Sequence, residues 1–426
     1  MDYKLTTLKN GLRVITVNLP NLESAAVTLW VGVGSRFEED KVAGVSHFLE
    51  HMVFKGSKKF PTARAVSLAV DSIGAENNAG TSHELTDFYI KSQAYQIERS
   101  FEILTDIVLN PLLKLPDIKR EKGVILEEIS MHKDNPMERI GDIFVNLTFA
   151  GNSLGRDVTG SMDSVRGITK ADFENYRKKH YHAKNLVLTV SGNIDENKIL
   201  HLADDYFGEL ESGTKEEAKT FTQDGGGPKV KLEYKDTEQA HLILGFYGYN
   251  RTHKDRFAEG LLSVILGKGM SSRLFTEIRE KRGLAYAVGS SISRFVDTGV
   301  FGTYAGINPK NITKVIKVIL NQSYGIASGK YPIREKELRK AKEFVKGRTA
   351  LSLEDTTEVN EFFGQRALFL PEIDTPEEFF KKVDGVRLED LERVAKDIFV
   401  PEKLNLAVIG PYKDENKFHK LISTQI

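Results

Sequence analysis

Hydrophobic and polar residues follow the same order in the two halves of the chain. Each half opens with two strand-like segments and an amphipathic helical segment, continues with a strand and helix and then a charged helix, and closes with a strand and helix. The matched segments are 13–17, 25–36, 47–56, 77–110, 118–132 and 184–207 in the first half, and 229–234, 240–251, 260–269, 299–322, 334–348 and 404–422 in the second. This order predicts an internal duplication of an α+β unit, a mostly antiparallel sheet with helices packed on it. Chance similarity of amphipathic patterns is the alternative.

The least periodic stretch of the chain lies between these halves. Residues 212–229, SGTKEEAKTFTQDGGGPK, combine charged residues, Ser and Thr with a Gly-Gly-Gly-Pro run, which is typical of a linker. The length of 426 residues also favours two domains, because single cores stop growing beyond roughly 250–300 residues. We therefore expect domains at 1–211 and 230–426, joined by this linker.

The helical segment of the first half carries a pair of histidines. Apolar residues at three- and four-residue spacing predict one face that packs on the core: Val45, Phe48, Leu49, Met52 and Val53. On the opposite face lie His47, Glu50 and His51, which form the H-x-x-E-H pattern of inverzincin hydrolases. Histidines four apart on a helix can both reach one zinc ion, and Glu50 is placed to act as general base on the attacking water. A solvated polar face is the alternative.

A catalytic zinc ion usually has three protein ligands, so a further carboxylate is needed. The segment REKGVILEEISMH offers Glu121 and Glu128, seven residues apart, on the face that we expect to turn inward with Val124, Ile125 and Ile129. The adjacent Glu127 is predicted to point to solvent. His132 is a competing ligand that would fill the position needed for water.

We predict Glu128 as the third ligand. Glu121 is then either a carboxylate that supports the site or a partner in a structural ion pair.

Composition narrows the chemistry further. With no cysteine, the chain has no disulfide and no thiolate ligand, so a metal must be held by His, Asp or Glu. Equal numbers of basic and acidic residues, 60 each, give no electrostatic reason to expect nucleic acid or a membrane as partner. The N-terminal residues lack the pattern of a secretory signal, and no apolar run approaches the ~18 residues of a membrane span. We expect a cytoplasmic protein.

With these motifs the sequence resembles the pitrilysin or insulinase metallopeptidases, within them the half-length group that includes mitochondrial processing peptidase. The resemblance extends over the whole chain: the H-x-x-E-H motif, GSRFEE at 34–39, NNAGTSHELTDFY at 77–89, and a Glu-x6-Glu pair that ends 77 residues after His51. It implies one Zn²⁺ per chain, bound by His47, His51 and Glu128.

The resemblance also assigns roles to residues outside the metal motif. In the second half, LLSVI replaces HFLEH and contains no ligand, whereas Arg279 and Tyr286 match a family Arg-x6-Tyr pair that binds substrate near the scissile bond. A surface charge and a core aromatic are the alternative. The family also binds the substrate backbone along an edge strand that corresponds to Asn78, Ala79, Gly80 and Thr81. A simple turn is the alternative there.

The function we predict is a zinc-dependent endopeptidase acting on unfolded peptides or small protein segments. Full-length family members enclose their substrate between two halves, so the resemblance implies a homodimer in which Arg279 and Tyr286 of one subunit serve the zinc of the other. Two other classes stay open: a non-catalytic binding or structural subunit, and a zinc amidohydrolase that acts on non-peptide substrates.

Overall fold

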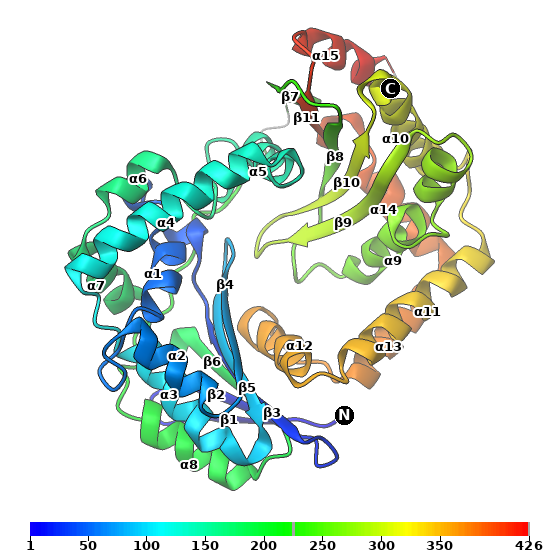
Figure 1. Ribbon diagram of the computed structural model, residues 1–426. Helices are drawn as coiled ribbons and strands as arrows, with labels where there is room; N and C mark the ends of the chain where they lie inside the picture. The colour runs from blue at the N-terminus through cyan, green and yellow to red at the C-terminus, as the bar shows by residue number, and fades with distance from the viewer. Residues whose placement is uncertain (224–225, 425–426) are drawn as a thin grey trace. The chain divides into compact units, whose positions relative to one another are not determined.

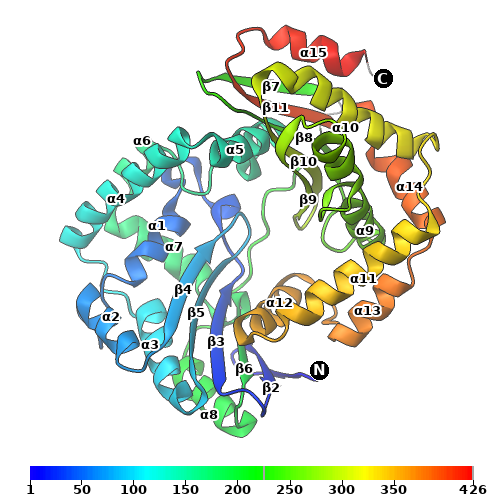
Figure 2. The ribbon, with the colours of Figure 1, turned by 45° about the vertical axis from the view of Figure 1, so that its right-hand side comes forward.

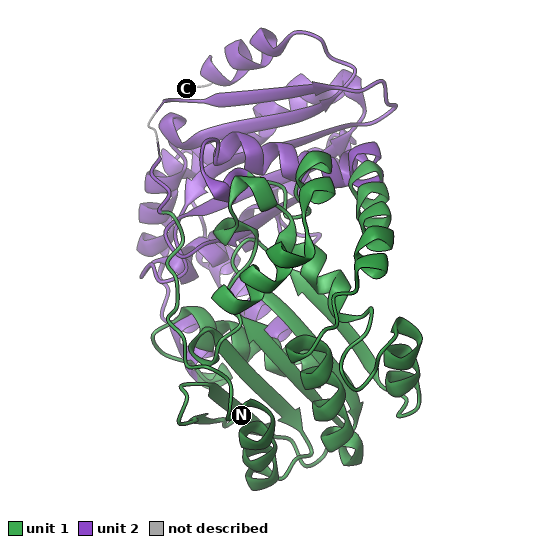
Figure 3. Ribbon diagram, turned by 90° about the vertical axis from the view of Figure 1, so that its left-hand side faces the viewer, with its two compact units in different colours: residues 1–130, 156–219, 350–377 green, residues 131–155, 220–349, 378–426 purple. Residues whose placement is uncertain are grey.

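The computed structural model describes residues 1–223 and 226–424, so residues 224 and 225 of the predicted linker lie outside the described residues. The chain forms two compact units of three segments each (Figure 3). Unit 1 comprises residues 1–130, 156–219 and 350–377, and unit 2 comprises residues 131–155, 220–349 and 378–426.

The two units differ from the predicted halves by two helices. One break between the units, at Lys219 and Thr220, falls inside the predicted linker. However, α5 (Pro136–Thr148) packs on strands of unit 2, and α12 (Thr356–Phe369) packs on strands of unit 1. Each unit thus takes a helix from the other half of the sequence.

Unit 1 is built on a six-stranded sheet in the order β1-β2-β6-β3-β5-β4. Its strands are β1 (Lys4–Thr7), β2 (Arg13–Asn18), β3 (Ser24–Val31), β4 (Glu76–Thr81), β5 (Thr86–Gln93) and β6 (Leu186–Gly192). All neighbours are antiparallel except β2 and β6. Strand β6 is buried along its whole length, whereas β5 alternates buried and half-buried residues, as expected for a strand near the edge.

Helices cover this sheet on both faces (Figures 1 and 2). The helices of unit 1, apart from α12, are α1 (Val45–Val53), α2 (Ala63–Asp71), α3 (Ile97–Leu109), most of α4 (Leu115–Asp134), α6 (Met162–Gly167), α7 (Lys170–His180) and α8 (Glu196–Phe207). Helix α3 packs on β3 and β5, while α12 packs on β3 and β6 with Trp30, Val359 and Phe363 in a shared apolar cluster. Strand β4 forms one end of the sheet.

Unit 2 repeats the same strand order in its five-stranded sheet, β7-β11-β8-β10-β9. Its strands are β7 (Lys229–Tyr234), β8 (Ala240–Gly248), β9 (Ala285–Arg294), β10 (Gly299–Ile307) and β11 (Leu404–Gly410). Its helices, apart from α5, are α9 (Arg256–Gly267), the π-helical η6 (Phe275–Glu280), α10 (Ile312–Ala327), most of α11 (Glu335–Ser352) and of α13 (Pro376–Asp384), α14 (Leu388–Ile398) and α15 (Glu415–Ser423). Leaving β1 aside, each strand of unit 1 has a counterpart in the same place, and β11 and β7 are again the parallel pair. The predicted duplicated α+β fold is confirmed.

Among the described residues, no helix combines the length and apolar character that crossing a membrane requires.

Candidate metal site

Helix α1 places two imidazoles side by side. The residues predicted to face the core are all buried: Val45, Phe48, Leu49, Met52 and Val53. On the other side of the helix, the rings of His47 and His51 lie with their centroids 4.7 Å apart. His47 is only 8% exposed and Glu50 and His51 are half-buried, so this face of α1 is not the solvated surface of the alternative interpretation.

Helix α4 brings Glu128 to these rings. One carboxylate oxygen of Glu128 lies 3.5 Å from Nε2 of His47, and the other lies 3.6 Å from Nε2 of His51. Two ligand atoms bound tetrahedrally at about 2.0–2.1 Å are separated by about 3.3 Å. Both distances are close to this value, and ligand atoms of all three side chains lie within 4.8 Å of one another, so the group could hold a single metal ion. Among the described residues, this is the one group of three or more potential ligands that converges closely enough to hold a metal.

Glu121 fixes the orientation of His51. Its carboxylate lies 2.9 Å from Nδ1 of His51 and forms a 2.8 Å ion pair with Nζ of Lys55. Burial acts to raise the pKa of Glu121, but the bonds from His51 and Lys55 outweigh it and hold that pKa below its usual value. With Nδ1 of His51 donating to a carboxylate, the lone pair of Nε2 is directed toward Glu128, which is the arrangement metal-binding histidines commonly adopt. Glu121 is therefore ion-paired with Lys55 and also contacts His51, one of the predicted ligands.

His47 has no comparable support for its ring. Its Nδ1 atom is buried and has no hydrogen-bond partner among the described residues. Burial acts to lower the pKa of His47, but the carboxylates of Glu128, Glu50 and Glu38 outweigh it and raise the pKa. The site thus has excess negative charge around its imidazoles, which favours a bound cation.

Glu50 lies beside this group without belonging to it. Its carboxylate accepts a 2.6 Å hydrogen bond from Oγ1 of Thr81, the last residue of strand β4. Its other carboxylate oxygen, which accepts no hydrogen bond from the described residues, and the position one turn from His47 suit a general base that need not bind the metal.

The other predicted residues on α4 divide as follows. Glu127 is exposed, as predicted, and His132 lies 3.8 Å from Glu138, outside the metal-binding group. Ile125 and Ile129 are buried, but the prediction for Val124 was wrong, since it is 49% exposed. The face that carries Glu121 and Glu128 therefore extends past the buried stripe of the helix to the surface.

Residues Asn78, Ala79, Gly80 and Thr81 form part of strand β4, so the alternative of a simple turn is wrong. They pair with β5, with Ala79 opposite Phe88 and Gly80 opposite Asp87. Because β4 ends the sheet order, its outer edge is the one at which a further strand can be added.

In unit 2, Arg279 and Tyr286 come together. Arg279 lies near the end of η6 and Tyr286 near the start of β9, with the guanidinium carbon 5.2 Å from the centre of the Tyr286 ring. The ring of Phe275 lies 5.0 Å from the same guanidinium. Tyr286 is 79% exposed, so it is not the core aromatic of the alternative interpretation.

Three further residues near the site had no role assigned to them from the sequence. Helical spacing places Lys55 on the same face as His47, Glu50 and His51, but its contact with Glu121 was not predicted. Glu38 contacts the start of α1 from a preceding loop, and Asp87 lies on β5, where burial, with Glu361 and Glu50 adding to it, raises the pKa to about 7. Both lie in segments quoted above for the family resemblance, 34–39 and 77–89, but those segments gave neither residue a role in the site.

Comparison with known proteins finds relatives over nearly the whole chain. The family described as Insulinase (Peptidase family M16) matches residues 13–161, and Peptidase M16 inactive domain matches residues 167–345. An uncharacterized zinc protease of Streptomyces coelicolor is 36% identical over 417 residues, covering 96% of this chain and 90% of that protein. The crystal structure of a protease from Helicobacter pylori is 26% identical with a TM-score of 0.89, covering 96% of this chain and 99% of that one. A peptidase M16 inactive domain from Pseudomonas fluorescens, at 19% identity, shares the fold with a TM-score of 0.90 and covers 97% of this chain and 100% of that one.

The duplicated α+β fold, with two histidines and a glutamate in one copy that could hold a metal, suits the zinc proteases among these relatives. The chain belongs to the insulinase family of peptidases, family M16, and is one of its half-length members.

Proposed function

We propose that this protein is a zinc-dependent endopeptidase that hydrolyses unfolded peptides or small protein segments. The observation that carries the proposal is the convergence of His47, His51 and Glu128 within 4.8 Å, with Glu50 beside them on the same helix as the histidines. The proposal is also supported by relatives that are named zinc proteases.

The donor set fits zinc. Two imidazole nitrogens and a carboxylate, in a chain without cysteine, are the ligands of many hydrolytic zinc sites, and three protein ligands leave a fourth position open. One zinc ion per chain, when bound there, supplies a Lewis acid that polarises a carbonyl and acidifies water. The remaining chemistry falls to the protein's own side chains.

Glu50 accepts the proton of the attacking water and passes it to the leaving amine of the cleaved bond. Its second oxygen is held by Thr81, so the carboxylate is oriented before substrate arrives. Thr81 ends the edge strand β4, and a substrate backbone added along that edge would be aligned by main-chain hydrogen bonds. Such recognition reads few side chains, which suits unfolded peptides of varied sequence.

The direct test is metal-dependent cleavage of a mixed library of unfolded peptides. We expect about one zinc per chain, loss of cleavage when a chelator removes it, and recovery on adding one equivalent back. Zinc binding without peptide cleavage, but with hydrolysis of non-peptide amides, would indicate an amidohydrolase. A folded protein that takes up no metal would indicate a non-catalytic subunit.

We further propose that two copies of the chain form the active enzyme. Arg279 and Tyr286 form an exposed pair in the unit without metal ligands, and cationic and phenolic donors suit the oxyanion that develops during peptide hydrolysis. In this arrangement the pair of one subunit serves the zinc site of its partner.

Mixing two inactive variants tests this sharing. Glu50→Gln and Arg279→Ala homodimers should each be nearly inactive, because each lacks one part of every site. Hybrid dimers contain one complete site, so a 1:1 mixture should recover roughly a quarter of wild-type activity, from half the dimers having one of two sites. Native mass spectrometry follows the subunit exchange, and the peptide cleavage of the exchanged mixture gives the recovered activity. Proven exchange without recovery would show that the pair does not act across subunits.

A further inference from the structure

Glu38 lies in the loop that leads into α1, and it is 7% exposed. One of its carboxylate oxygens accepts a 2.7 Å hydrogen bond from the backbone N–H of Gly44. The other accepts a 2.8 Å bond from the backbone N–H of Ser46 and a short one from the Ser46 hydroxyl. A single buried carboxylate thus satisfies two of the N–H groups that the start of a helix leaves without partners.

Helix α1 cannot supply this bond from its own cap residue. The cap is Gly44, with φ at +92°, and its own side chain is absent. A Cβ at this position would lie 2.5 Å from the carbonyl oxygen of Thr159, so Ser, Thr, Asp or Asn cannot stand there without displacing backbone. The usual N-cap residues are therefore excluded, and Glu38 provides the acceptor from six residues upstream.

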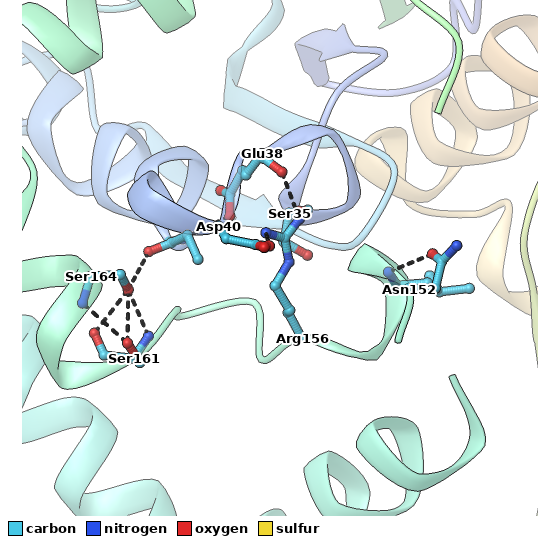
Figure 4. A network of polar contacts seen from close by, with 10 residues as sticks. Ser35, Glu38, Asp40, Asn152, Arg156, Ser161 and Ser164 are labelled. Carbon is cyan, nitrogen blue, oxygen red and sulfur yellow. Dashed lines mark hydrogen bonds and ion pairs between the residues drawn. The ribbon is translucent and has the colours of Figure 1, made fainter. Parts of the chain in front are cut away.

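The loop that carries Glu38 is itself tied down (Figure 4). Arg156 forms a 2.7 Å ion pair with Asp40 and donates a 2.6 Å hydrogen bond to the backbone carbonyl of Glu38. On the other side of the helix start, the hydroxyl of Ser164 donates to the carbonyl of Ala43 at 2.7 Å. These contacts hold the backbone that leads into Gly44.

His47 depends on this anchorage more than the other ligands. It is the third residue of α1, in the first turn, where helices fray most readily. The ring of His51 is held by Glu121, but Nδ1 of His47 has no hydrogen-bond partner among the described residues. The position of the His47 ring is therefore set by packing and by the backbone to which it is attached.

We propose that Glu38 is a positioning residue for the metal site, which fixes the first turn of α1 and thereby the placement of His47 toward the ion. This inference rests on the proposed function, since it assumes that His47 is a zinc ligand. The hydrogen bonds that Glu38 accepts come from Gly44 and Ser46 and not from His47, His51 or Glu128, so it positions His47 through the backbone, while its charge also acts on the His47 imidazole.

Glu38→Gln tests the proposal. Glutamine keeps the shape but has one acceptor oxygen, so one of the two N–H groups loses its partner and the negative charge at the helix start is removed. We expect zinc affinity to fall by about 10–100-fold, the range found for residues that orient metal ligands. The visible absorption bands of the cobalt-substituted protein should also shift, because the ligand geometry changes. Competition with a chromogenic chelator and cobalt spectra measure the two effects.

Glu259→Gln is the matched control. Glu259 is a buried carboxylate of unit 2 that accepts a hydrogen bond from the backbone N–H of Tyr249 and is paired with Arg294. The same change there should lower the melting temperature while leaving zinc affinity and the cobalt spectrum unchanged. It separates loss of general stability from displacement of the metal ligand.

Ser46→Ala is the milder variant, and it tests the positioning role of Glu38 if the Glu38→Gln protein does not fold. It removes the hydroxyl contact while keeping both backbone bonds, so zinc affinity should fall roughly three- to fivefold, as expected for a loss of about 1 kcal/mol. Wild-type zinc affinity and cobalt spectra in the folded variants would overturn the positioning role. A wild-type protein that binds zinc tightly but cleaves no peptide would overturn the proposed function and leave this inference standing.

Discussion

Replacing Glu50 with Gln is expected to abolish peptide hydrolysis while the protein retains one zinc ion per chain. The carboxylate is the proton acceptor in the proposed reaction, and removing a general base costs about 10²–10⁴-fold in rate. Zinc should stay, because Glu50 lies outside the group formed by His47, His51 and Glu128. Glutamine has nearly the same shape and keeps an oxygen for the hydroxyl of Thr81, so the surrounding strand should not move. Turnover and zinc content, measured on one preparation, test both halves of the prediction.

The two readouts separate the roles that Glu50 can have. Normal turnover with stoichiometric zinc would remove Glu50 from the role of base. Loss of zinc together with activity would instead make Glu50 a ligand, contrary to the geometry. Thr81→Val provides a graded comparison, because it removes the hydrogen bond that orients Glu50 but leaves the carboxylate. Its effect should be smaller, on the order of tenfold, as expected for losing one hydrogen bond to a charged group.

The element order was predictable because it depends on local periodicity. Apolar residues every second position mark strands, and apolar residues at three- and four-residue spacing mark helices, so the two copies could be aligned before their topology was known. The matching strand orders of the two sheets confirm that alignment. The exchange of α5 and α12 between the units was not predictable. Their amphipathic patterns show that one face is buried, but not which sheet covers it.

The residues of the candidate site likewise separate into those that local patterns predict and those that they do not. His47, Glu50 and His51 were found from helical spacing together with the H-x-x-E-H pattern, because residues three and four apart lie on one face. Predicting Glu121 and Glu128 as residues of the site required only the expectation that a second helix also turns one face inward. Thr81 donates a hydrogen bond to Glu50, 31 positions away in the sequence. Glu38 accepts hydrogen bonds from the start of α1, up to eight positions away. No periodicity reports such contacts, because they depend on how the chain folds back on itself.

Glu128→Gln is the second change with a large expected effect, and its neighbour provides the control. Glu128 places its two oxygens 3.5 Å and 3.6 Å from Nε2 of His47 and of His51, so it is the side chain that bridges both imidazoles. A neutral amide is a poor zinc ligand, and a structural zinc site worth about 10–16 kcal/mol over four ligands assigns each roughly 3 kcal/mol. We therefore expect zinc affinity to fall by about 100-fold or more, with peptide hydrolysis lost at ordinary zinc concentrations. Competition with a chelator of known affinity measures the change.

Glu127→Gln makes the same chemical change one residue away, on the exposed side of α4. It alters the net charge of the helix equally, so any general electrostatic effect on zinc binding should appear in both variants. Because successive residues on a helix point about 100° apart, Glu127 cannot take the place of Glu128. We expect Glu127→Gln to bind zinc and cleave peptides as the wild type does. Equal losses in the two variants would mean that charge near the site, and not coordination by Glu128, determines metal binding. Undiminished zinc affinity in Glu128→Gln would require a different third ligand. His132 is not a ready substitute, since its ring lies beside Glu138.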